Sequence, residues 1–307
     1  MELSVIICTY NRVDSLIRVL RSFENQKIKS DIKWEIIIID NNSRDETHNR
    51  VLEFRNETGM EIRYFLEINQ GLSYARNRGV VESRGEYLFF IDDDEMAHEG
   101  LVEAVYRTFK DHGCDSVGGR IHLLPQGRLP SWLEQELWGF LGHLDYGDEV
   151  IQLDEERYPF GGNMAFSRKA FEKTGLFHVD MGRKGQHLFG GEECDFFKRF
   201  LASGGTGIYQ PNAIAYHIVE KQRMKKRYFR KLHYSSGLQQ AHLDDEHLSG
   251  FRCLHGIPLF LFRQLTGSAI RLGRDIVVHG WDRSFRKEMT FWHFLGLMTG
   301  YYQRQSS

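Results

Sequence analysis

The stretch Tyr87-Leu88-Phe89-Phe90-Ile91-Asp92-Asp93-Asp94-Glu95 decides the fold, because five apolar residues lead directly into four acidic ones. An unbroken apolar run of this length is typical of a strand that is buried on both faces of a parallel sheet. The strand delivers its carboxylates to one edge of the sheet, where they repel one another unless a cation or hydrogen bonds neutralise them. The pattern indicates a divalent metal, and oxygen ligands favour Mg²⁺ or Mn²⁺ over zinc. A solvated acidic turn is the alternative.

Strand-like and helix-like segments alternate through the first third of the chain. Short apolar runs occupy residues 3–8, 35–40, 62–66 and 86–91, and helical periodicity occupies residues 12–25, 45–56 and 72–83. This alternation predicts a doubly wound α/β domain. Because ligands bind at the carboxyl ends of the strands in such sheets, the residues just past those ends are the candidates. They are Thr9-Tyr10-Asn11-Arg12, Asp40-Asn41-Asn42-Ser43, Asn69-Gln70-Gly71 and Asp92-Asp93-Asp94.

The middle of the chain is less regular. Its pattern predicts a helix at 102–112, a strand at 115–124, a short aromatic helix at 137–141, a strand and a helix after the glycine turn at 161–162, and a strand at 213–219. Residues 180–191 are flanked by glycines and predict a mobile loop. A helix that carries Glu192-Glu193-Cys194-Asp195 follows that loop.

The charge of the chain is unevenly distributed. With 307 residues, of which 41% are hydrophobic, the chain is long enough to bury a large core and carry an appendage. Residues 221–307 hold 15 Lys and Arg against 6 Asp and Glu, a balance of +9, whereas residues 1–220 hold 25 against 36, a balance of −11. A basic C-terminal third indicates an anionic partner such as lipid headgroups or phosphate. We therefore predict a domain at 1–220 and a basic helical region at 221–307.

The cysteines and the two ends of the chain indicate the cellular compartment of the protein. The four cysteines, Cys8, Cys114, Cys194 and Cys253, are far apart and form no CxxC pair, which favours a reducing compartment and argues against a zinc site. The first apolar strand begins without a basic segment before it, so no signal peptide is expected. The longest uncharged stretch near the C-terminus, residues 289–303, has 15 residues and is too short to span a bilayer.

Four motifs, taken in order, resemble family 2 glycosyltransferases of the GT-A fold. They are Ser4-Val5-Ile6-Ile7-Cys8-Thr9-Tyr10-Asn11-Arg12, Glu35-Ile36-Ile37-Ile38-Ile39-Asp40-Asn41-Asn42-Ser43, Asn69-Gln70-Gly71 with Ala75-Arg76-Asn77-Arg78-Gly79, and the Asp92 block. The resemblance covers roughly residues 3–220. It implies a Rossmann-like, mixed and mostly parallel sheet sandwiched by helices. The nucleotide-sugar-binding half is expected at about 1–118 and the acceptor half at about 119–220, followed by a C-terminal helical appendage.

The resemblance places a nucleoside-diphosphate sugar, expected to be UDP-linked, at the strand ends. The residues implied around this donor are Thr9, Tyr10, Asn11, Arg12, Asp40, Asn69, Gly71, Arg76, Asn77, Asp92 and Asp93. Some of them have local alternatives. Asp40 is also a candidate to cap the following helix, and Arg76 is also a candidate for a solvent-facing position. Gly71 suits a close backbone approach or a positive φ.

Asp92-Asp93-Asp94 resembles the DXD element of the family, in which the first Asp faces the ribose and the last binds a metal that bridges the diphosphate. The implied metal is Mn²⁺ or Mg²⁺, with Asp94 as the principal ligand, Asp92 beside it and His217 as an additional ligand. A histidine next to apolar residues is also often structural. A divalent cation at this position stabilises the negative charge that develops on a leaving diphosphate.

Glu192-Glu193-Cys194-Asp195 resembles the acidic motif at a helix start whose second acid is the general base of the family. The acceptor hydroxyl must lose a proton as it attacks. The resemblance gives this role to Glu193, with Glu192 as a rival and Asp195 as a further catalytic residue. The alternative is that the helix dipole favours acids in a first turn. The expected acceptor residues are Gly161, Gly162 and Asn163, with Trp132 and Trp138 either stacked on a sugar or packed in a core.

The C-terminal third combines basic and apolar residues. Residues 221–231 contain seven Lys and Arg, and the later segments mix Arg and Lys with aromatic and aliphatic side chains. This combination is typical of helices that lie in a membrane interface, where anionic lipids add roughly 1 kcal/mol per basic residue. We expect peripheral association with a membrane surface. Ordinary helices packed on the catalytic domain or in a homodimer are the alternative, and no nucleic-acid-binding signature accompanies the basic run.

Together these features predict a metal-dependent, inverting glycosyltransferase that moves a sugar from a nucleoside-diphosphate sugar to a hydroxyl of a saccharide or lipid-linked saccharide. The expected role is polysaccharide or cell-surface glycan synthesis, in the cytoplasm at the inner face of the membrane. Two other classes remain open. A nucleotidyl or phosphoryl transferase would need a glycine-rich loop where this chain has Thr9-Tyr10-Asn11-Arg12. A non-catalytic nucleotide-sugar-binding membrane adaptor would not need the acids at 192–195.

Overall fold

The computed structural model describes residues 1–29, 31–182, 191–243 and 251–306, and these fold into two units. Of the described residues, unit 1 holds 1–124, 142–182 and 191–218, and unit 2 holds 125–141 and 219–306. Unit 2 therefore includes a segment, 125–141, that the predicted boundary at residue 220 assigned to the catalytic domain. Residues 183–190 of the predicted mobile loop lie outside the described residues.

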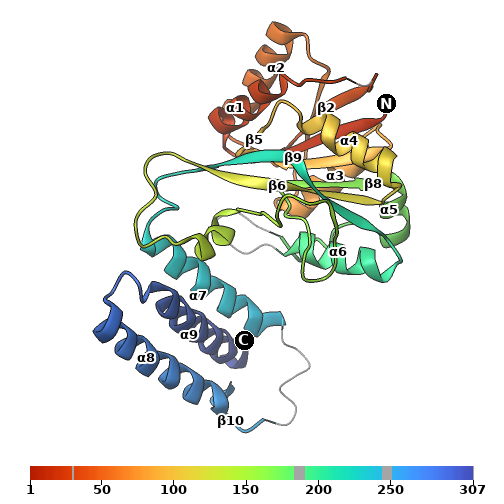
Figure 1. Ribbon diagram of the computed structural model, residues 1–307. Coiled ribbons are helices and arrows are strands. Elements are labelled where there is room, and N and C mark those ends of the chain that lie inside the picture. Colours follow the sequence, from red (N-terminus) through yellow and green to blue (C-terminus); the bar gives the residue numbers. More distant parts are fainter. Residues whose placement is uncertain (30, 183–190, 244–250, 307) are drawn as a thin grey trace. The chain divides into compact units, whose positions relative to one another are not determined.

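Unit 1 is built on a mixed sheet of nine strands (Figure 1). The order along the sheet is β3-β2-β1-β4-β8-β6-β9-β5, with β7 beside β9. The strands β3, β2, β1 and β4 run parallel, and β8, next to β4, runs antiparallel to it. Their bounds are β1 Leu3–Thr9, β2 Trp34–Asp40, β3 Ile62–Leu66, β4 Tyr87–Asp92, β5 Glu95–Ala97, β6 Ser116–Pro125, β7 Ile151–Gln152, β8 Asn163–Ser167 and β9 Gly207–Val219.

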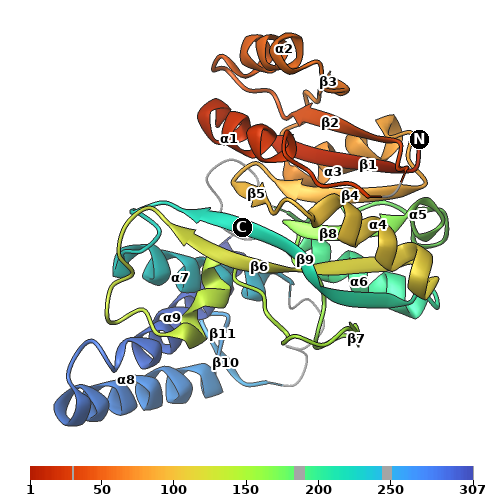
Figure 2. The ribbon, with the colours of Figure 1, turned by 45° about the horizontal axis from the view of Figure 1, so that its top comes forward.

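Helices cover both faces of this sheet, which confirms the predicted mixed sheet sandwiched by helices (Figures 1 and 2). Val5 and Ile7 of β1 pack with α1, α2 and α4 on one face, whereas Ile6, between them, packs with α3, α5 and α6 on the other. Strand side chains alternate between faces, so a strand covered on both sides must be apolar throughout. The helices are α1 Val13–Phe23, α2 Thr47–Thr58, α3 Leu72–Glu82, α4 Leu101–His112, α5 Arg168–Thr174 and α6 Glu192–Ala202.

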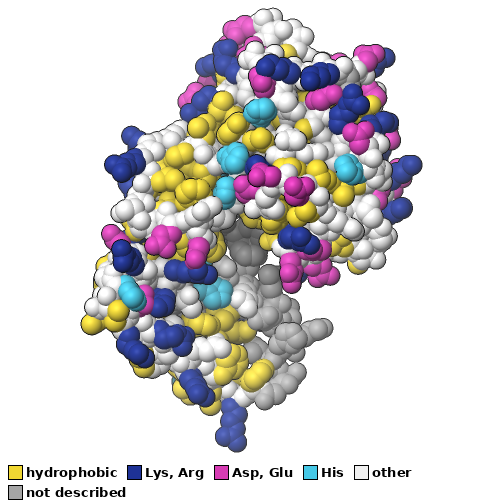
Figure 3. Space-filling model, in the orientation of Figure 1, with side chains coloured by type: hydrophobic (Ala, Val, Ile, Leu, Met, Phe, Trp, Pro, Cys, Tyr) yellow, Lys and Arg dark blue, Asp and Glu magenta, His cyan; other side chains and the backbone are white. Residues whose placement is uncertain are grey.

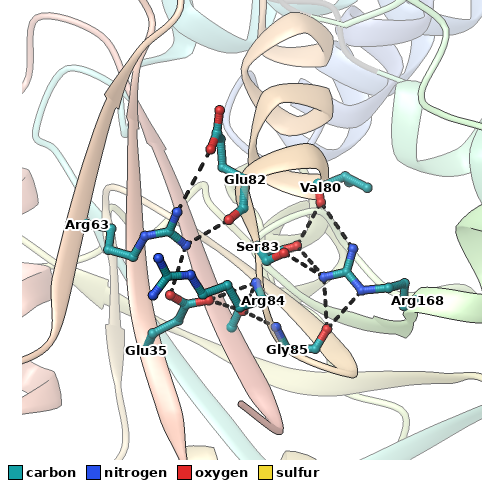
Figure 4. Close-up of polar contacts among 9 residues, drawn as sticks. Glu35, Arg63, Val80, Glu82, Ser83, Arg84, Gly85 and Arg168 are labelled. Atoms are coloured by element: carbon teal, nitrogen blue, oxygen red, sulfur yellow. Dashed lines mark hydrogen bonds and ion pairs between the residues drawn. The ribbon is translucent and has the colours of Figure 1, made fainter.

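A buried glutamate ties the amino-terminal ends of the parallel strands together (Figure 4). The carboxylate of Glu35, at the start of β2, accepts hydrogen bonds from Ser4 Oγ at 2.7 Å, from the backbone N of Arg84 at 2.9 Å and from Arg63 Nη1 at 3.1 Å. Nearby, Arg168 donates to the carbonyl oxygens of Ser83 and Gly85. Both carboxylate oxygens of Glu35 are thereby used in the interior, so the charge is compensated where it is buried.

Unit 2 is helical, as predicted for the C-terminal region. It contains the 3₁₀ helix η1 Gln135–Leu141, the short hairpin β10 Cys253–Leu254 and β11 Ile257–Pro258, and the helices α7 Lys226–Leu243, α8 Leu259–His279 and α9 Phe285–Ser306. The predicted aromatic helix at 137–141 is thus a tighter 3₁₀ turn. Among the described residues, no helix combines the length and the hydropathy that crossing a membrane requires.

The helices α7 and α9 pack with their backbones in close contact. A Cβ atom on Gly237 of α7 would lie 2.0 Å from the carbonyl oxygen of His293, and one on Gly296 of α9 would lie 2.0 Å from that of Tyr234. Only glycine permits so close an approach. Trp132 completes an aromatic cluster in the same unit, with its ring edge-on to Phe229 at 5.4 Å and to Phe285 at 4.7 Å.

Candidate active site

A cavity of about 210 Å³ opens in unit 1 at the carboxyl ends of β1, β2 and β4, next to the start of α3. Parallel strands end at the same sheet edge, which is why segments far apart in sequence meet here. Its lining is Cys8, Thr9, Tyr10, Arg12, Asn41, Gln70, Leu72, Ala75, Asp92, Asp93 and Asp94. The structure therefore brings together six of the predicted donor and metal residues: Thr9, Tyr10, Arg12, Asp92, Asp93 and Asp94.

The acidic block is mostly buried, which excludes the solvated acidic turn. Asp93, Asp94 and Glu95 are each at most 6% exposed, and only Asp92 reaches solvent with over a third of its side chain. Arg12 Nη1 donates to Asp93 Oδ1 at 2.8 Å and to Asp94 Oδ2 at 2.9 Å. One guanidinium thus offsets the charge of two neighbouring carboxylates.

Asp93 is held from two sides. Thr9 Oγ1 donates to its Oδ2 at 2.7 Å, and Arg12 binds its other oxygen. Burial raises the pKa of Asp93 to about 6, against the opposing effect of Arg12 and with a further contribution from the charge of Asp94. Burial by itself lowers the pKa of Arg12, but the two carboxylates outweigh it and raise that pKa above its ordinary value. Asp93 therefore orders the Arg12 side chain beside Asp94.

Asp94 and His217 meet through the strand pair β5 and β9. These strands are antiparallel with Glu95 opposite His217, and the backbone N of Ile218 donates to the carbonyl oxygen of Asp94 at 2.8 Å. His217 Nε2 lies 3.4 Å from Asp94 Oδ2, and both side chains are buried. A Cβ on Gly142 would stand 2.8 Å from His217 Nδ1, so glycine makes room for the ring.

Asp94 and His217 are two of the three predicted metal ligands, and the structure brings them together. Within the described part of the chain, no three His, Cys, Asp or Glu side chains are gathered as a metal site. A carboxylate oxygen nevertheless suits Mn²⁺ or Mg²⁺, and Mg²⁺ takes most of its remaining ligands from substrate phosphates and water, whereas an imidazole nitrogen favours the transition metal Mn²⁺ over Mg²⁺. The chemistry of Asp94 and His217 therefore fits such an ion.

Asp40 and Asn11 shape the loops beside the cavity. Asp40 accepts hydrogen bonds from the backbone N of Ser43 at 2.8 Å and from Tyr64 Oη at 2.6 Å. It thus closes a turn and does not cap α2, which begins only at Thr47. Asn11 has a positive φ of 51°, and its Oδ1 accepts from the backbone N of Arg44 at 2.7 Å. Asn11 fixes the loops after β1 and β2 to each other, Asp40 ties the loop after β2 to Tyr64 of β3, and the donor roles of both residues stay predictions.

Asn41 is one of the strand-end candidates, but the sequence reasoning gave it no role in the site. Its Nδ2 donates to the carbonyl oxygens of Glu67 and Asn69, at 3.2 and 2.6 Å, and its Oδ1 accepts from the backbone N of Gly71 at 2.8 Å. The side chain thereby joins the loop after β2 to the start of α3. Its position directly after the Asp at a strand end was the available signal. Gly71 has the predicted positive φ, at 145°.

Arg76 links three elements below the cavity. It is buried, and its Nη1 donates to Glu192 Oε1 at 2.6 Å and its Nη2 to Asp92 Oδ1 at 3.4 Å. A Cβ on Gly161 would lie 2.3 Å from Arg76 Nη2, which explains glycine there. Burial lowers the pKa of Arg76, but Glu192 and Asp92 more than reverse this and raise it. The alternative of a solvent-facing Arg76 is therefore wrong.

The two candidate bases differ in their surroundings. Glu192 is 2% exposed and ion-paired with Arg76. Glu193, one residue on, is partly exposed, and its Oε2 accepts a hydrogen bond from the backbone N of Gly191 at 3.3 Å. A general base must reach the hydroxyl that it deprotonates. Of the two, Glu193 has the accessible carboxylate.

Three other predicted residues have structural partners. Asp195 Oδ2 lies 3.0 Å from both Arg199 Nε and His178 Nδ1. Asn77 binds the backbone of Phe177 through both ends of its amide, at 2.9 and 3.0 Å. Asn69 is exposed, and its Nδ2 donates to Glu67 Oε1 at 2.9 Å. Asp195, Asn77 and Asn69 do not line the cavity, so their catalytic or donor roles stay predictions.

The predicted acceptor residues are divided between the units. In unit 1, a Cβ on Gly162 would lie 2.0 Å from Glu95 Oε1, and Asn163 Nδ2 donates to the carbonyl oxygens of Arg120 and Ala213. In unit 2, Trp132 belongs to the aromatic cluster, and Trp138 Nε1 donates to the carbonyl oxygen of Leu133 at 3.2 Å. Packing therefore accounts for the position of Trp132, and acceptor binding by these residues stays a prediction.

Two curated proteins are similar to this chain in sequence over most of its length. The succinoglycan biosynthesis protein ExoM of Rhizobium meliloti (strain 1021) is 25% identical over 260 residues, which cover 84% of this chain and 80% of that protein. The glucosyl-dolichyl phosphate glucuronosyltransferase of Haloferax volcanii is 26% identical over 223 residues, which cover 71% and 69% of the two chains.

Among solved structures, the mannosyltransferase PcManGT from Pyrobaculum calidifontis, in complex with GDP-Man and Mn²⁺, aligns with a TM-score of 0.63 over 100% of this chain and 88% of that one. Because the two sequences are only 16% identical, this likeness shows a shared fold and nothing more. The family described as "Glycosyl transferase family 2" matches residues 4–175, more than half of the chain. The chain therefore belongs to glycosyl transferase family 2 and is a glycosyltransferase.

Proposed function

We propose that the enzyme transfers one sugar from a nucleoside-diphosphate sugar, bound in the cavity at the ends of β1, β2 and β4, to a hydroxyl acceptor with inversion. The observation that carries this proposal is the wall of that cavity, where Asp92, Asp93 and Asp94 lie beside Arg12. A diphosphate brought to this wall needs a cation between its oxygens and the carboxylates. PcManGT, of the same fold, was solved with GDP-Man and Mn²⁺.

The metal proposed here is Mn²⁺ or Mg²⁺, held by Asp94 and His217 with Asp92 close to the donor. When bound, such an ion stabilises the negative charge on the departing nucleoside diphosphate. The protein supplies the positioning: Arg12 keeps Asp93 and Asp94 together, and Thr9 fixes Asp93. Tyr10, Asn41 and Gln70 also line the cavity and would offer polar and aromatic groups to the nucleoside. A UDP-linked donor is the first candidate.

Glu193 is the proposed base. It would take the proton of the acceptor hydroxyl as the oxygen attacks the anomeric carbon from the side opposite the diphosphate. Because the reaction is a single displacement, the anomeric configuration inverts. Glu192 has a different role, since it compensates the buried charge of Arg76 under the site.

For the acceptor we propose a saccharide or a lipid-linked saccharide, in glycan biosynthesis. The two relatives support this class, because one is named for succinoglycan biosynthesis and the other for transfer to glucosyl-dolichyl phosphate. A lipid-linked acceptor would bring the enzyme to a membrane surface, and we include peripheral membrane association in the proposal. The surplus of nine positive charges in residues 221–307 supports it.

The test is product analysis with the purified chain and a panel of UDP- and GDP-linked sugars, each with Mn²⁺, with Mg²⁺ and with a chelator. Acceptors are free saccharides and lipid-linked saccharides. We expect nucleoside diphosphate and a glycosylated product in equal amounts, only with a divalent ion, and NMR should show an inverted anomer. Release of pyrophosphate, a retained anomer or full activity in chelator would each contradict one part of the proposal.

A further inference from the structure

The helix α8 of unit 2 exposes most of its apolar side chains. Only Leu261 and Ser268 of its residues are buried. Val277 and Val278 are 86% and 71% exposed, and Trp281, just after the helix, is 55% exposed. The exposed large apolar residues on and beside α8 are Leu259, Phe260, Phe262, Ile270, Val277, Val278 and Trp281. We call these seven residues, with the arginines among them, the α8 face.

The charge on this face is of one sign. Arg263, Arg271 and Arg274 are exposed on α8, whose sequence contains Asp275 as its single acid. That acid is compensated, because Asp275 is paired with Lys287 of α9. Figure 3 shows dark-blue and yellow side chains interspersed in the lower part of the view, where Figure 1 draws α8. The face therefore combines exposed apolar surface with a net positive charge.

A cavity of about 290 Å³ lies within this face, at the end of α8 and the start of α9. It is lined by Arg271, Arg274, Asp275, Val278, His279 and Lys287. Three permanent cations surround one carboxylate, so the cavity keeps a positive charge even with His279 neutral. Arginine forks bind phosphate oxygens in pairs. The chemistry of the cavity thus suits a phosphate group, and Val278 on its wall connects it to the exposed apolar residues.

We propose that the α8 face docks on an anionic phospholipid bilayer, with a headgroup phosphate in the cavity and Val277, Val278 and Trp281 in the interfacial layer. This inference rests on the membrane association proposed above and names the surface responsible. Apolar and aromatic side chains enter the interface while arginines bind the headgroups. The tryptophan ring is suited to this depth because its body is apolar and its N–H is polar.

The charge argues against a second copy of the chain as the occupant. A two-fold contact places the same patch on both sides of the interface. Two α8 faces would then bring two copies of Arg263, Arg271 and Arg274 into one interface, with Asp275 already paired. An anionic membrane offers complementary charge to all three arginines at once.

The experiment is flotation of the full chain with two kinds of vesicle, phosphatidylcholine alone and phosphatidylcholine mixed with phosphatidylglycerol. The test variants are Arg271→Glu with Arg274→Glu, and Val277→Ser with Val278→Ser. The matched control is Arg18→Glu with Arg55→Glu, two exposed arginines of unit 1. We expect the natural chain to bind the anionic vesicles. Each test variant should bind these vesicles at least about tenfold more weakly than the natural chain. The control variant should bind them as tightly as the natural chain. Thermal unfolding of every variant checks that it is folded.

Several results would overturn the proposal. In one, the natural chain and the arginine variant bind the vesicles equally. Another surface of the protein would then bind the membrane. In another, the natural chain binds neither vesicle, and inorganic phosphate raises its unfolding temperature but not that of the arginine variant. The cavity would then bind a soluble phosphate ligand. A third is a concentration-dependent dimer that the valine variant disrupts. Sugar transfer to a soluble acceptor is measured in parallel, so that a failed docking surface is distinguished from a failed enzyme assignment.

Discussion

At the scale of single residues, the site distributes charge so that each acid has a different task. Arg12 compensates Asp93 and Asp94, and Arg76 compensates Glu192 and contacts Asp92. Each guanidinium favours the charged form of the carboxylates that it contacts, although burial still raises the pKa of Asp93 to about 6. Beside these paired acids, Glu193 and Asp92 are partly exposed, and Asp94 lines the cavity as the proposed metal ligand.

The pair Glu192 and Glu193 allows this division to be tested. Glu193→Ala should lower kcat about a hundred- to ten-thousandfold, the usual contribution of a general base, with a loss of less than about 1 kcal/mol in the free energy of unfolding. Glu192→Ala leaves the buried Arg76 without its 2.6 Å partner, and the free energy of unfolding should fall by about 3–5 kcal/mol. Denaturant unfolding and initial rates measure the two effects. Equal stability losses in both variants would refute the assignment.

The sequence predicted the residue types of the site better than their partners. Asp92, Asp93 and Asp94 were recognisable because they follow a buried strand. The ion pair of Arg76 with Glu192 joins α3 to α6, and nothing in the local pattern of either helix indicates the other. The role of Asn41 was not predicted for the same reason, since its bonds to Asn69 and Gly71 exist only once two loops lie together.

At the scale of elements, the parallel strands were predictable and the antiparallel ones were less so. Because β1, β2 and β4 are buried on both faces, their sequences are nearly continuous apolar runs, which are recognisable as strands. β5 has only three residues, begins with Glu95 and is defined by its pairing with β9. No periodic pattern exists in three residues, so the strand that places Asp94 beside His217 was not predicted. For β9, only the apolar end at 213–219 was predicted, although the strand spans Gly207–Val219.

The contact between α7 and α9 predicts a position where even alanine is too large. In Gly237→Ala, the new methyl group would meet the His293 carbonyl, which is backbone and cannot turn away. We expect the free energy of unfolding to fall by about 1–3 kcal/mol. Gly273→Ala in α8 is the matched control, because a Cβ there has open space, and it should stabilise by about 0.5–1 kcal/mol through helix propensity. Thermal and denaturant unfolding compare the two, and a neutral Gly237→Ala would contradict the close backbone contact.

The buried Glu35 predicts a second stability effect, at the end of the sheet away from the cavity. In Glu35→Gln, one carboxylate oxygen becomes an NH2 group that cannot accept, so either the bond from Arg63 to Oε2 or the bonds from Ser4 and Arg84 to Oε1 are lost. The free energy of unfolding should fall by about 2–3 kcal/mol. Glu24→Gln is the control, since its surface contact with Arg21 at 3.9 Å contributes less than about 1 kcal/mol. If both substitutions cost the same, the network in Figure 4 does not stabilise the strand ends.

At the scale of the whole molecule, composition and geometry give the two units surfaces of opposite charge. Unit 1 carries the cavity lined by three aspartates, where we propose a cation and a diphosphate, and unit 2 carries the basic α8 face. The charge balance of the sequence already indicated this division. Its boundary required the structure, because residues 125–141 belong to unit 2 although they precede most of the acceptor half in sequence.

Ligand binding in unit 1 should therefore stabilise the protein only when nucleotide and metal are present together. At one hundred times its dissociation constant, a ligand that binds only the native state raises the free energy of unfolding by about 2.7 kcal/mol. We expect this rise with UDP or GDP plus Mn²⁺, and a much smaller rise with nucleotide in chelator.

Asp94→Asn removes a carboxylate oxygen beside His217 and should abolish the part of the rise that depends on Mn²⁺. Asp154→Asn, in an exposed loop, should keep it. The comparison uses the ligand-induced change in each variant, because Asp94→Asn also weakens the Arg12 pair and lowers stability without ligand. An equal change with and without metal would show that Arg12 and the cavity backbone bind the diphosphate by themselves.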